Sequence, residues 1–349
     1  MSTNQLSTAH AVLELSPQLS RAISRRLYPG GSATSRRAVD DDNSDHLAYL
    51  AEAIRTGDNA LFVNYAQWLK VRYATKPQTG QSVESVLEAL RYAITECAPG
   101  ATTSAVVPIL DTALAALPGS PDTAPSYLDR DAPYAATARQ YLDRLLAADR
   151  RKASELVLQS AGDGAPIRDI YVHVFQPCLR EVGRLWQMNR ISVAQEHYCT
   201  AATQLVMAQL CPYVFSGVTS DRRMVATCVG GELHELGIRM VTDLMEMAGW
   251  DTYYLGANMT TGGILAAIEE YDAHLLALSA TMVYHVHLVE ETIAAVRASE
   301  RTSGVSVMVG GFPFLVSPDL WRTVGADGFA PDPDTAIAVA DRLVPGEKP

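Results

Sequence analysis

The 349-residue sequence contains no hydrophobic run that approaches the length of a membrane span, and residues 1–10 lack a signal-peptide pattern. Basic residues are few and form no cluster: 28 Lys and Arg stand against 39 Asp and Glu, for a net charge of −11. This balance argues against nucleic-acid binding by the chain alone. Paired cysteines at metal or redox spacing are also missing, so we expect a reduced, cytoplasmic protein without a membrane partner. The scattered cysteines are Cys97, Cys178, Cys199, Cys211 and Cys228.

The first third of the chain is predicted to be helical. Residues 1–43 are Ser-rich, contain Pro29-Gly30-Gly31 and are expected to form a flexible leader, with at most a weak helix over 11–27. Residues 44–118 have apolar positions at helical spacing and should form an N-terminal helical module. Residues 119–133 are rich in proline and are interpreted as a linker. The helices expected in the module cover 45–54, 60–73, 83–94 and 104–117.

The remaining chain is predicted to form a helical bundle followed by an α/β domain. Residues 134–217 predict four helices with short connections, which favours an antiparallel four-helix bundle, and Pro177 should kink its third helix. In residues 218–349, short β-prone segments alternate with helices, and this order is typical of a parallel, flavodoxin-like (Rossmann-type) five-stranded sheet. The bundle helices are expected at 134–147, 151–160, 167–188 and 192–214, and the strands at 224–229, 251–255, 274–279, 306–309 and near 328.

One loop of the predicted sheet has a distinctive pattern. His234 lies between the first strand and the first helix, at the carboxyl end of a parallel strand, where open α/β sheets bind ligands. Forty-one residues separate Gly237 from Ser279, and twenty-eight separate Thr281 from Gly310-Gly311. The alternative interpretation is a generic α/β domain with a hydrogen-bonded loop histidine and glycines that serve turns.

This spacing resembles the cobalamin-binding signature Asp-x-His-x-x-Gly, then Ser-x-Leu, then Gly-Gly. The resemblance implies base-off/His-on binding, in which His234 is the lower axial ligand of the cobalt and Glu232 accepts a hydrogen bond from its second ring nitrogen. Two positions differ from the signature, because Glu232 replaces Asp and Thr281 replaces Leu. The resemblance further implies that the nucleotide tail of the cofactor passes Gly237, Ser279, Thr281, Gly310 and Gly311.

A second constellation lies in the predicted bundle. Trp186 is followed ten residues later by Glu196-His197, with Val193 between them. This arrangement resembles the upper-face motif of the CarH-type adenosylcobalamin photoreceptors. The resemblance implies that Trp186 and Val193 shape a pocket, while Glu196 and His197 hold the adenosyl group. The sequence departs from those receptors at Gln187, where they have a cobalt-capturing His. The alternative is a core tryptophan and a polar helix start.

The helical module before residue 119 does not resemble a DNA-binding domain. Its layout is similar to that of the photocobilins, which pair cobalamin with a bilin. A linear tetrapyrrole would require aromatic walls and cations. An ordinary aromatic core is the alternative interpretation. The side chains that could bind biliverdin are Tyr65, Trp68, Arg72, Tyr73, Arg91 and Tyr92, and His285 and His287 are interpreted as loop or helix-start residues.

The leading hypothesis from the sequence is a light sensor, not an enzyme. In it, photolysis of the cobalt–carbon bond of adenosylcobalamin changes the contacts of the bundle, with biliverdin as a second chromophore. The signal would pass through a homo-oligomer, with a dimer favoured, or through a separate effector. The alternative is a corrinoid carrier that transfers methyl groups between partner methyltransferases. A third hypothesis, the small subunit of an adenosylcobalamin isomerase, would require a substrate domain that this sequence does not contain.

Overall fold

The computed structural model describes residues 2–29, 33–75, 81–128, 131–215 and 220–345, with only the backbone described for 33–42. The chain forms two compact units. The first unit comprises Met1–Thr123 together with Met282–His287 and Phe312–Val324, and the second comprises the remaining residues. Among the described residues, no helix is both long enough and apolar enough to cross a membrane.

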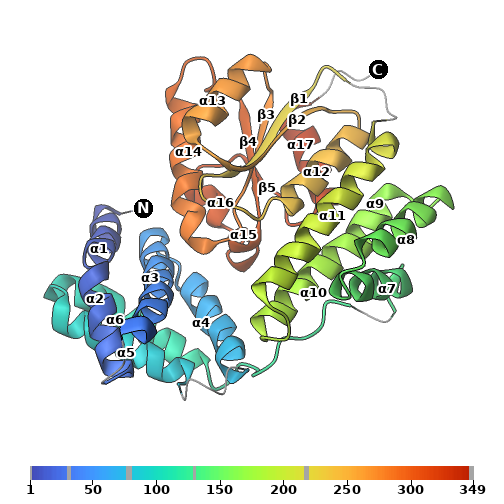
Figure 1. Ribbon diagram of the computed structural model, residues 1–349. Helices are drawn as coiled ribbons and strands as arrows, with labels where there is room; N and C mark the ends of the chain where they lie inside the picture. The colour runs from blue at the N-terminus through green and yellow to red at the C-terminus, as the bar shows by residue number, and fades with distance from the viewer. Residues whose placement is uncertain (1, 30–32, 76–80, 129–130, 216–219, 346–349) are drawn as a thin grey trace. The chain divides into compact units, whose positions relative to one another are not determined.

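The first unit is built from helices, of which α1 to α6 are coloured blue to cyan in Figure 1. Helix α1 begins with a capping box in which Ser2 and Gln5 exchange hydrogen bonds. The helices pack through leucine, isoleucine and phenylalanine side chains such as Leu50, Phe62 and Leu87, all at most 1% exposed. The elements are α1 (Thr3–Glu14), α2 (Ser16–Leu27), α3 (Ala33–Thr56), α4 (Asn59–Ala74), α5 (Val83–Cys97), α6 (Gly100–Ala116), η3 (Val283–His285), α15 (Phe312–Val316) and α16 (Leu320–Thr323).

The expectation of a flexible leader over residues 1–43 is wrong for residues 3–27, which form α1 and α2. Val12, Leu19 and Ile23 are fully buried, because α1 packs against α3 and α2 packs against α5. Tertiary packing therefore stabilises α1, which the sparse apolar pattern did not predict, and α2, which it predicted only as a weak helix. The four helices predicted for residues 45–117 are confirmed, although α3 begins twelve residues earlier, at Ala33.

In the second unit the bundle contains the four predicted helices, with the third divided. Just before Pro177, where the sequence predicts a kink, the helix contains a π-helical turn over Tyr171–Phe175. Proline has no N–H to donate to the carbonyl four residues earlier, so the α-helical bonding pattern cannot continue through this turn. The elements are α7 (Ala135–Leu146), α8 (Arg150–Gly162), α9 (Ile167–Ile170), η2 (Tyr171–Phe175), α10 (Gln176–Gln187) and α11 (Val193–Val214).

The second unit also contains the predicted five-stranded parallel sheet, with strand order β2-β1-β3-β4-β5. Helices α12 and α17 cover one face of the sheet, and α13 and α14 cover the other (Figure 1). The flavodoxin-like prediction is therefore confirmed. The elements are β1 (Arg223–Val229), α12 (Leu236–Met247), β2 (Asp251–Met259), α13 (Thr261–Glu270), β3 (Leu275–Ser279), α14 (Val286–Ala298), β4 (Ser306–Gly310), β5 (Gly328–Phe329) and α17 (Pro333–Leu343).

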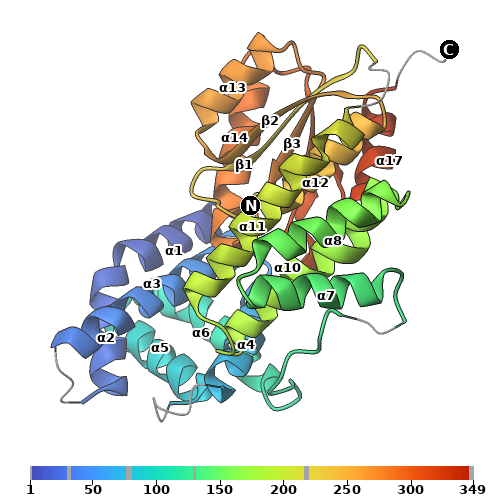
Figure 2. The same cartoon turned by 45° about the vertical axis from the view of Figure 1, so that its right-hand side comes forward.

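Bundle and sheet share a hydrophobic core within this unit. Leu236, Met240 and Leu244 of α12 are buried in the same apolar cluster as the bundle side chains, and α11 runs alongside α12 in both views (Figures 1 and 2). A hydrogen bond of 2.7 Å from the Tyr171 hydroxyl to Asp243 Oδ2 adds a polar connection. This packing fixes the bundle beside the helix that follows the His234 loop. The domain boundaries predicted from the sequence stay predictions.

Candidate functional site at the carboxyl ends of the strands

Strand register brings the separate parts of the sequence motif together. Ser279, the last residue of β3, pairs with Cys228 of β1 on one side and with Gly310 of β4 on the other. All three strands are parallel, so the loops that follow them meet at one edge of the sheet. The turn into the His234 loop is fixed by Gly231, whose φ is +75° and whose N–H donates to Asn258 Oδ1 at 2.7 Å. Residues far apart in the sequence thus form one site.

Glu232 is the buried centre of this site. Its side chain is fully buried, and Oε1 accepts from the backbone N–H of His234 at 2.9 Å and lies 2.6 Å from the ring nitrogen Nδ1. The other oxygen, Oε2, accepts from the backbone N–H of Thr281 at 2.7 Å. A carboxylate with three partners satisfies the requirement for a buried charge to be hydrogen-bonded. Glutamate, which replaces the aspartate of the signature, therefore reaches His234 directly.

His234 is held at one nitrogen and open at the other. Its hydrogen bond to Glu232 raises the pKa of the imidazole above its ordinary value, with a smaller contribution from the charge of Glu196. The side chain nevertheless remains 58% exposed, and the adjacent Leu233 is 70% exposed. Because Nδ1 faces Glu232, Nε2 is the ring nitrogen that can bind a further group. A Cβ added to Gly237 would meet no atom within 4 Å, so this side of the loop has room.

In the Gly310-Gly311 pair after β4, the fold itself requires a glycine at one position. Gly311 has a φ of +107°, and a Cβ there would lie 1.9 Å from the carbonyl oxygen of Ala280. Ala280 in turn donates its N–H to the Gly310 carbonyl at 3.2 Å. The backbone of the chain itself therefore approaches too closely for a side chain at Gly311. At Gly310 the nearest atom to an added Cβ, Ala330 O, is 3.4 Å away, which is ordinary contact.

A second hydrogen-bond network, around the carboxylate of Glu235, was not predicted from the sequence. Glu235 accepts from Gln204 Nε2 of α11 at 2.5 Å and from the Tyr254 hydroxyl of β2 at 2.8 Å. It thereby connects a bundle helix to the sheet immediately beside His234. The only signal in the sequence is the position of Glu235 directly after His234, since its partners lie 31 and 19 residues away along the chain.

The residues of the second constellation lie around the start of α11. Val193 is 54% exposed, and the Glu196 carboxylate lies 2.8 Å from His197 Nδ1 and accepts from the Thr200 hydroxyl at 3.0 Å. Trp186 is partly buried in the last turn of α10. The contribution of Glu196 to the raised pKa of His234 places the two side chains within electrostatic reach.

The side chains considered for a bilin do not form one group. Tyr65 stacks on Trp68, whose ring lies 5.6 Å from the Arg72 guanidinium, and all three belong to α4. On α5, Arg91 forms an ion pair with Asp111 at 2.8 Å, and Tyr92 lies beneath Arg26. Arg91 and Tyr92 thus have partners outside the α4 stack, and the bilin site stays a prediction. Tyr73 also lies on α4 and is partly buried.

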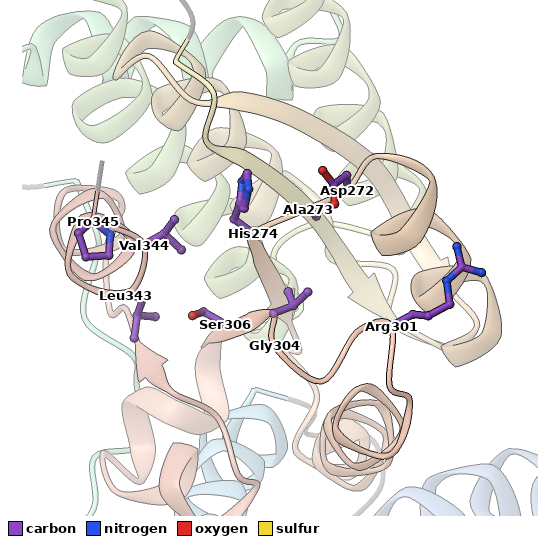
Figure 3. A pocket seen from close by; sticks show the side chains of 10 residues that line it. Asp272, Ala273, His274, Arg301, Gly304, Ser306, Leu343, Val344 and Pro345 are labelled. Atoms are coloured by element: carbon purple, nitrogen blue, oxygen red, sulfur yellow. The ribbon is translucent and has the colours of Figure 1, made fainter. Parts of the chain in front are cut away.

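A cavity of about 360 Å³ lies at the opposite edge of the sheet (Figure 3). His274 precedes β3 and Ser306 begins β4, so this cavity opens at the amino ends of the strands, away from His234. In the described part of the chain, no group of three or more His, Cys, Asp or Glu side chains is arranged to hold a metal ion. None of the motif residues lines this cavity, so the cavity and the His234 site are separate features. The other lining residues are Asp272, Ala273, Arg301, Gly304, Val305, Leu343, Val344 and Pro345.

Known proteins resemble the second unit of this chain. Residues 222–340 match a family model described as B12 binding domain, and residues 137–210 match a second model of the same description. A corrinoid protein of Desulfitobacterium hafniense (strain Y51) is 24% identical over 168 residues, which cover 47% of this chain and 76% of that protein. Dimethylamine corrinoid protein 1 of Methanosarcina mazei is 27% identical over 120 residues, which cover 34% of this chain.

The match spans 54% of the length of that dimethylamine corrinoid protein. Among solved structures, the monomethylamine corrinoid protein of Methanosarcina barkeri matches with a TM-score of 0.54 and 21% identity, covering 61% of this chain and 100% of that one. This structural likeness concerns the fold. Together the two family models give the chain a cobalamin-binding module, and residues 1–136 lie outside both models.

Proposed function

We propose that this chain is a corrinoid carrier that transfers methyl groups between partner methyltransferases. The observation that carries the proposal is the exposed imidazole of His234 fixed at Nδ1 by the buried Glu232 carboxylate, at the ligand-binding edge of a cobalamin-binding module. The relatives support a carrier more than a light sensor, because those named are corrinoid proteins, several of them for dimethylamine.

The residues of the site fit a corrinoid bound base-off. A corrinoid in this position would supply a cobalt centre that accepts and releases a methyl group. Glu232 would keep the proton of His234 on Nδ1, so that the lone pair of Nε2 could bind the cobalt. The tail would lie along Ser279 and Thr281 and past Gly237, where the backbone leaves space. The exposed Leu233 would be covered by the corrin ring.

The experiment that tests the axial ligand is an absorption titration of the full chain with hydroxocobalamin. His234→Ala should abolish the imidazole-ligated spectrum, whereas His274→Ala, which removes an exposed histidine at the opposite end of the strands, should leave it intact. An imidazole-ligated spectrum that persists in His234→Ala would contradict the assignment. Binding of methylcobalamin in preference to adenosylcobalamin is the further result expected for a carrier.

A light sensor that binds adenosylcobalamin is the second candidate, favoured by the Glu196–His197 pair within electrostatic reach of His234. In this function Trp186 and Val193 would form the apolar wall of the adenosyl pocket, and release of the adenosyl group would change the contacts of α11. A homodimer or a separate signalling effector would receive the change. Biliverdin would then be a second chromophore.

Two measurements separate the candidates. Glu196→Ala should weaken adenosylcobalamin far more than hydroxocobalamin if the adenosyl pocket exists, and equally if it does not. Absorption spectra of the protein with adenosylcobalamin and biliverdin, recorded before and after green light, provide the second readout. Bleaching together with a red band retained through desalting would favour the sensor. Binding of methylcobalamin without adenosylcobalamin would favour the carrier.

A further inference from the structure

Two segments of the first unit begin directly after residues of the corrinoid site. Met282–His287 follows Thr281, and Phe312–Val324 follows Gly311. Both segments belong by their packing to the helical unit of residues 1–123, although in sequence they interrupt the second unit. The connections after β3 and β4 therefore continue covalently from the corrinoid site, while they pack against the N-terminal helices.

Within the first unit, the segment Met282–His287 is held by specific contacts with α3. The Tyr284 ring meets the Tyr49 ring edge-on, with centroids 5.3 Å apart and an interplanar angle of 88°. His287 Nδ1 lies 3.7 Å from the Oε2 atom of Glu52, which is buried and hydrogen-bonded to Arg55. Tyr49 stacks in turn on Tyr65 of α4 at 3.7 Å. A change in the position of this segment would thus displace the stacked rings of Tyr49 and Tyr65 in the helical unit.

At its other end the same segment is connected to the axial histidine. Thr281 donates its N–H to Glu232 Oε2, and Glu232 Oε1 is paired with His234. One rigid carboxylate therefore couples the orientation of the imidazole to the backbone that leads into Met282. The connection after β4 is held next to Thr281, because the neighbouring Ala280 donates its N–H to the Gly310 carbonyl.

We propose that the N-terminal helical unit is a regulatory domain that responds to corrinoid bound at His234 through the segment Met282–His287. The proposal rests on the proposed corrinoid site. Corrinoid binds to the imidazole that Glu232 already holds and places its tail beside Thr281, and the contact of Tyr284 with Tyr49 transmits the effect to α3. Coupling between sites is reciprocal, so the helical unit also sets the affinity of the site for corrinoid.

Hydrogen–deuterium exchange of the full chain, with and without hydroxocobalamin, tests the coupling. Exchange in residues 45–56 and 282–287 should slow by at least about 5-fold on binding, the lower end of typical coupling factors. Tyr284→Ala should keep the imidazole-ligated spectrum and lose the slowing in α3. Tyr271→Ala is the matched control, because it removes a stacked ring from Tyr253 within the second unit, and it should behave as wild type.

The outcomes distinguish this proposal from the one on which it rests. An imidazole-ligated spectrum with unchanged exchange in α3 would overturn the regulatory role and leave the corrinoid site standing. Failure of the wild-type protein to form the imidazole-ligated spectrum would contradict both the corrinoid site and the regulatory role. If Tyr284→Ala does not fold, Tyr49→Leu removes the same ring contact from the side of α3, and His287→Ala removes the second contact of the segment, with Glu52. Retained slowing in a folded variant of this set would also overturn the proposal.

Discussion

Glu232 holds His234 at two points, since one carboxylate oxygen lies 2.9 Å from the backbone nitrogen and 2.6 Å from Nδ1 of the ring. The same side chain is fully buried and uses its second oxygen on Thr281. Burial alone would lower the pKa of His234, but the hydrogen bond to Glu232 outweighs it and raises the pKa. The position of the imidazole is thus set by the fold before any ligand binds.

Glu232→Gln should weaken corrinoid binding without unfolding the protein. The amide provides one oxygen where three donors converge, so its NH₂ group must face either the Thr281 N–H or the His234 donors. We expect a stability loss of about 1–3 kcal/mol and an affinity for hydroxocobalamin lowered roughly 10- to 100-fold. Absorption titration and urea unfolding measure the two effects.

Glu246→Gln is the control for that substitution. Glu246 receives both of its hydrogen bonds, from the N–H and the hydroxyl of Thr252, on the single oxygen Oε2. A glutamine can accept both bonds through its amide oxygen, so affinity and stability should stay near wild type. Equal affinity for hydroxocobalamin in Glu232→Gln and Glu246→Gln would contradict the role assigned to Glu232.

The two motif glycines Gly311 and Gly237 should respond differently to alanine. Gly311→Ala combines a positive φ with a Cβ that would overlap the Ala280 carbonyl, so it should destabilise the fold by about 3 kcal/mol or more. Gly237→Ala meets open space in the first turn of α12, where alanine favours the helix by roughly 0.5–1 kcal/mol.

Stability and corrinoid binding should therefore separate in these two variants. Gly237→Ala should be at least as stable as wild type in thermal unfolding, yet bind hydroxocobalamin more weakly, since the added methyl group occupies space proposed for the tail. A Gly237→Ala protein with unchanged affinity would show that the tail does not pass this residue. A Gly311→Ala protein of wild-type stability would contradict the close backbone approach.

The sheet could be predicted from the sequence because each β-prone segment is followed by a helix, and that order permits only parallel crossovers. Strand β2 is longer than predicted, reaching Met259 instead of residue 255. Gly256 and Asn258 have positive φ values of 82° and 56°, and the pairing of β1 with β2 shifts register there. A glycine and an asparagine predict the end of a strand, yet here they form irregularities within it.

The site was predictable where its residues keep fixed intervals along the chain, as His234, Ser279 and Gly310 do. The Glu235 network was not, because a hydrogen bond from Gln204 depends on how α11 packs against α12 and follows no sequence interval. Helix α1 was missed for the same reason, and α2 was expected only as a weak helix. Their few buried residues, such as Leu19 and Ile23, acquire partners only in the folded unit.

Gln204→Glu should destabilise the second unit. It would place a carboxylate against Glu235, which already accepts from Gln204 and Tyr254, and we expect a loss of about 1–3 kcal/mol. The same change at Gln195 should have the opposite sign. Gln195 is the third residue of α11 and completes a capping box with Ser192, a position where glutamate also fits and where negative charge adds about 0.3–1 kcal/mol. Urea unfolding of both variants measures the difference. A Gln204→Glu protein of wild-type stability would contradict the hydrogen bond between Gln204 and Glu235.

His46 should make the first unit sensitive to acid. Burial lowers the pKa of His46 to about 4 from an ordinary value of 6.5, and its Nδ1 lies 2.7 Å from the Tyr65 hydroxyl. Between these two pH values the unfolded chain binds the proton and the folded chain does not, so stability falls as the pH decreases from 6.5 toward 4. The full difference of 2.5 pH units corresponds to about 3 kcal/mol, and none of it is lost above pH 6.5.

His46→Gln should remove this dependence, because glutamine is buried without titrating and can still accept from Tyr65. We expect urea midpoints for the variant that change less between pH 7 and pH 4.5 than those of the wild type. His10→Gln, at an exposed histidine of α1, should keep the wild-type dependence. If the His46→Gln and wild-type midpoints fall in parallel over this range, protonation of His46 is not the cause, and other groups must carry the acid sensitivity of the helical unit.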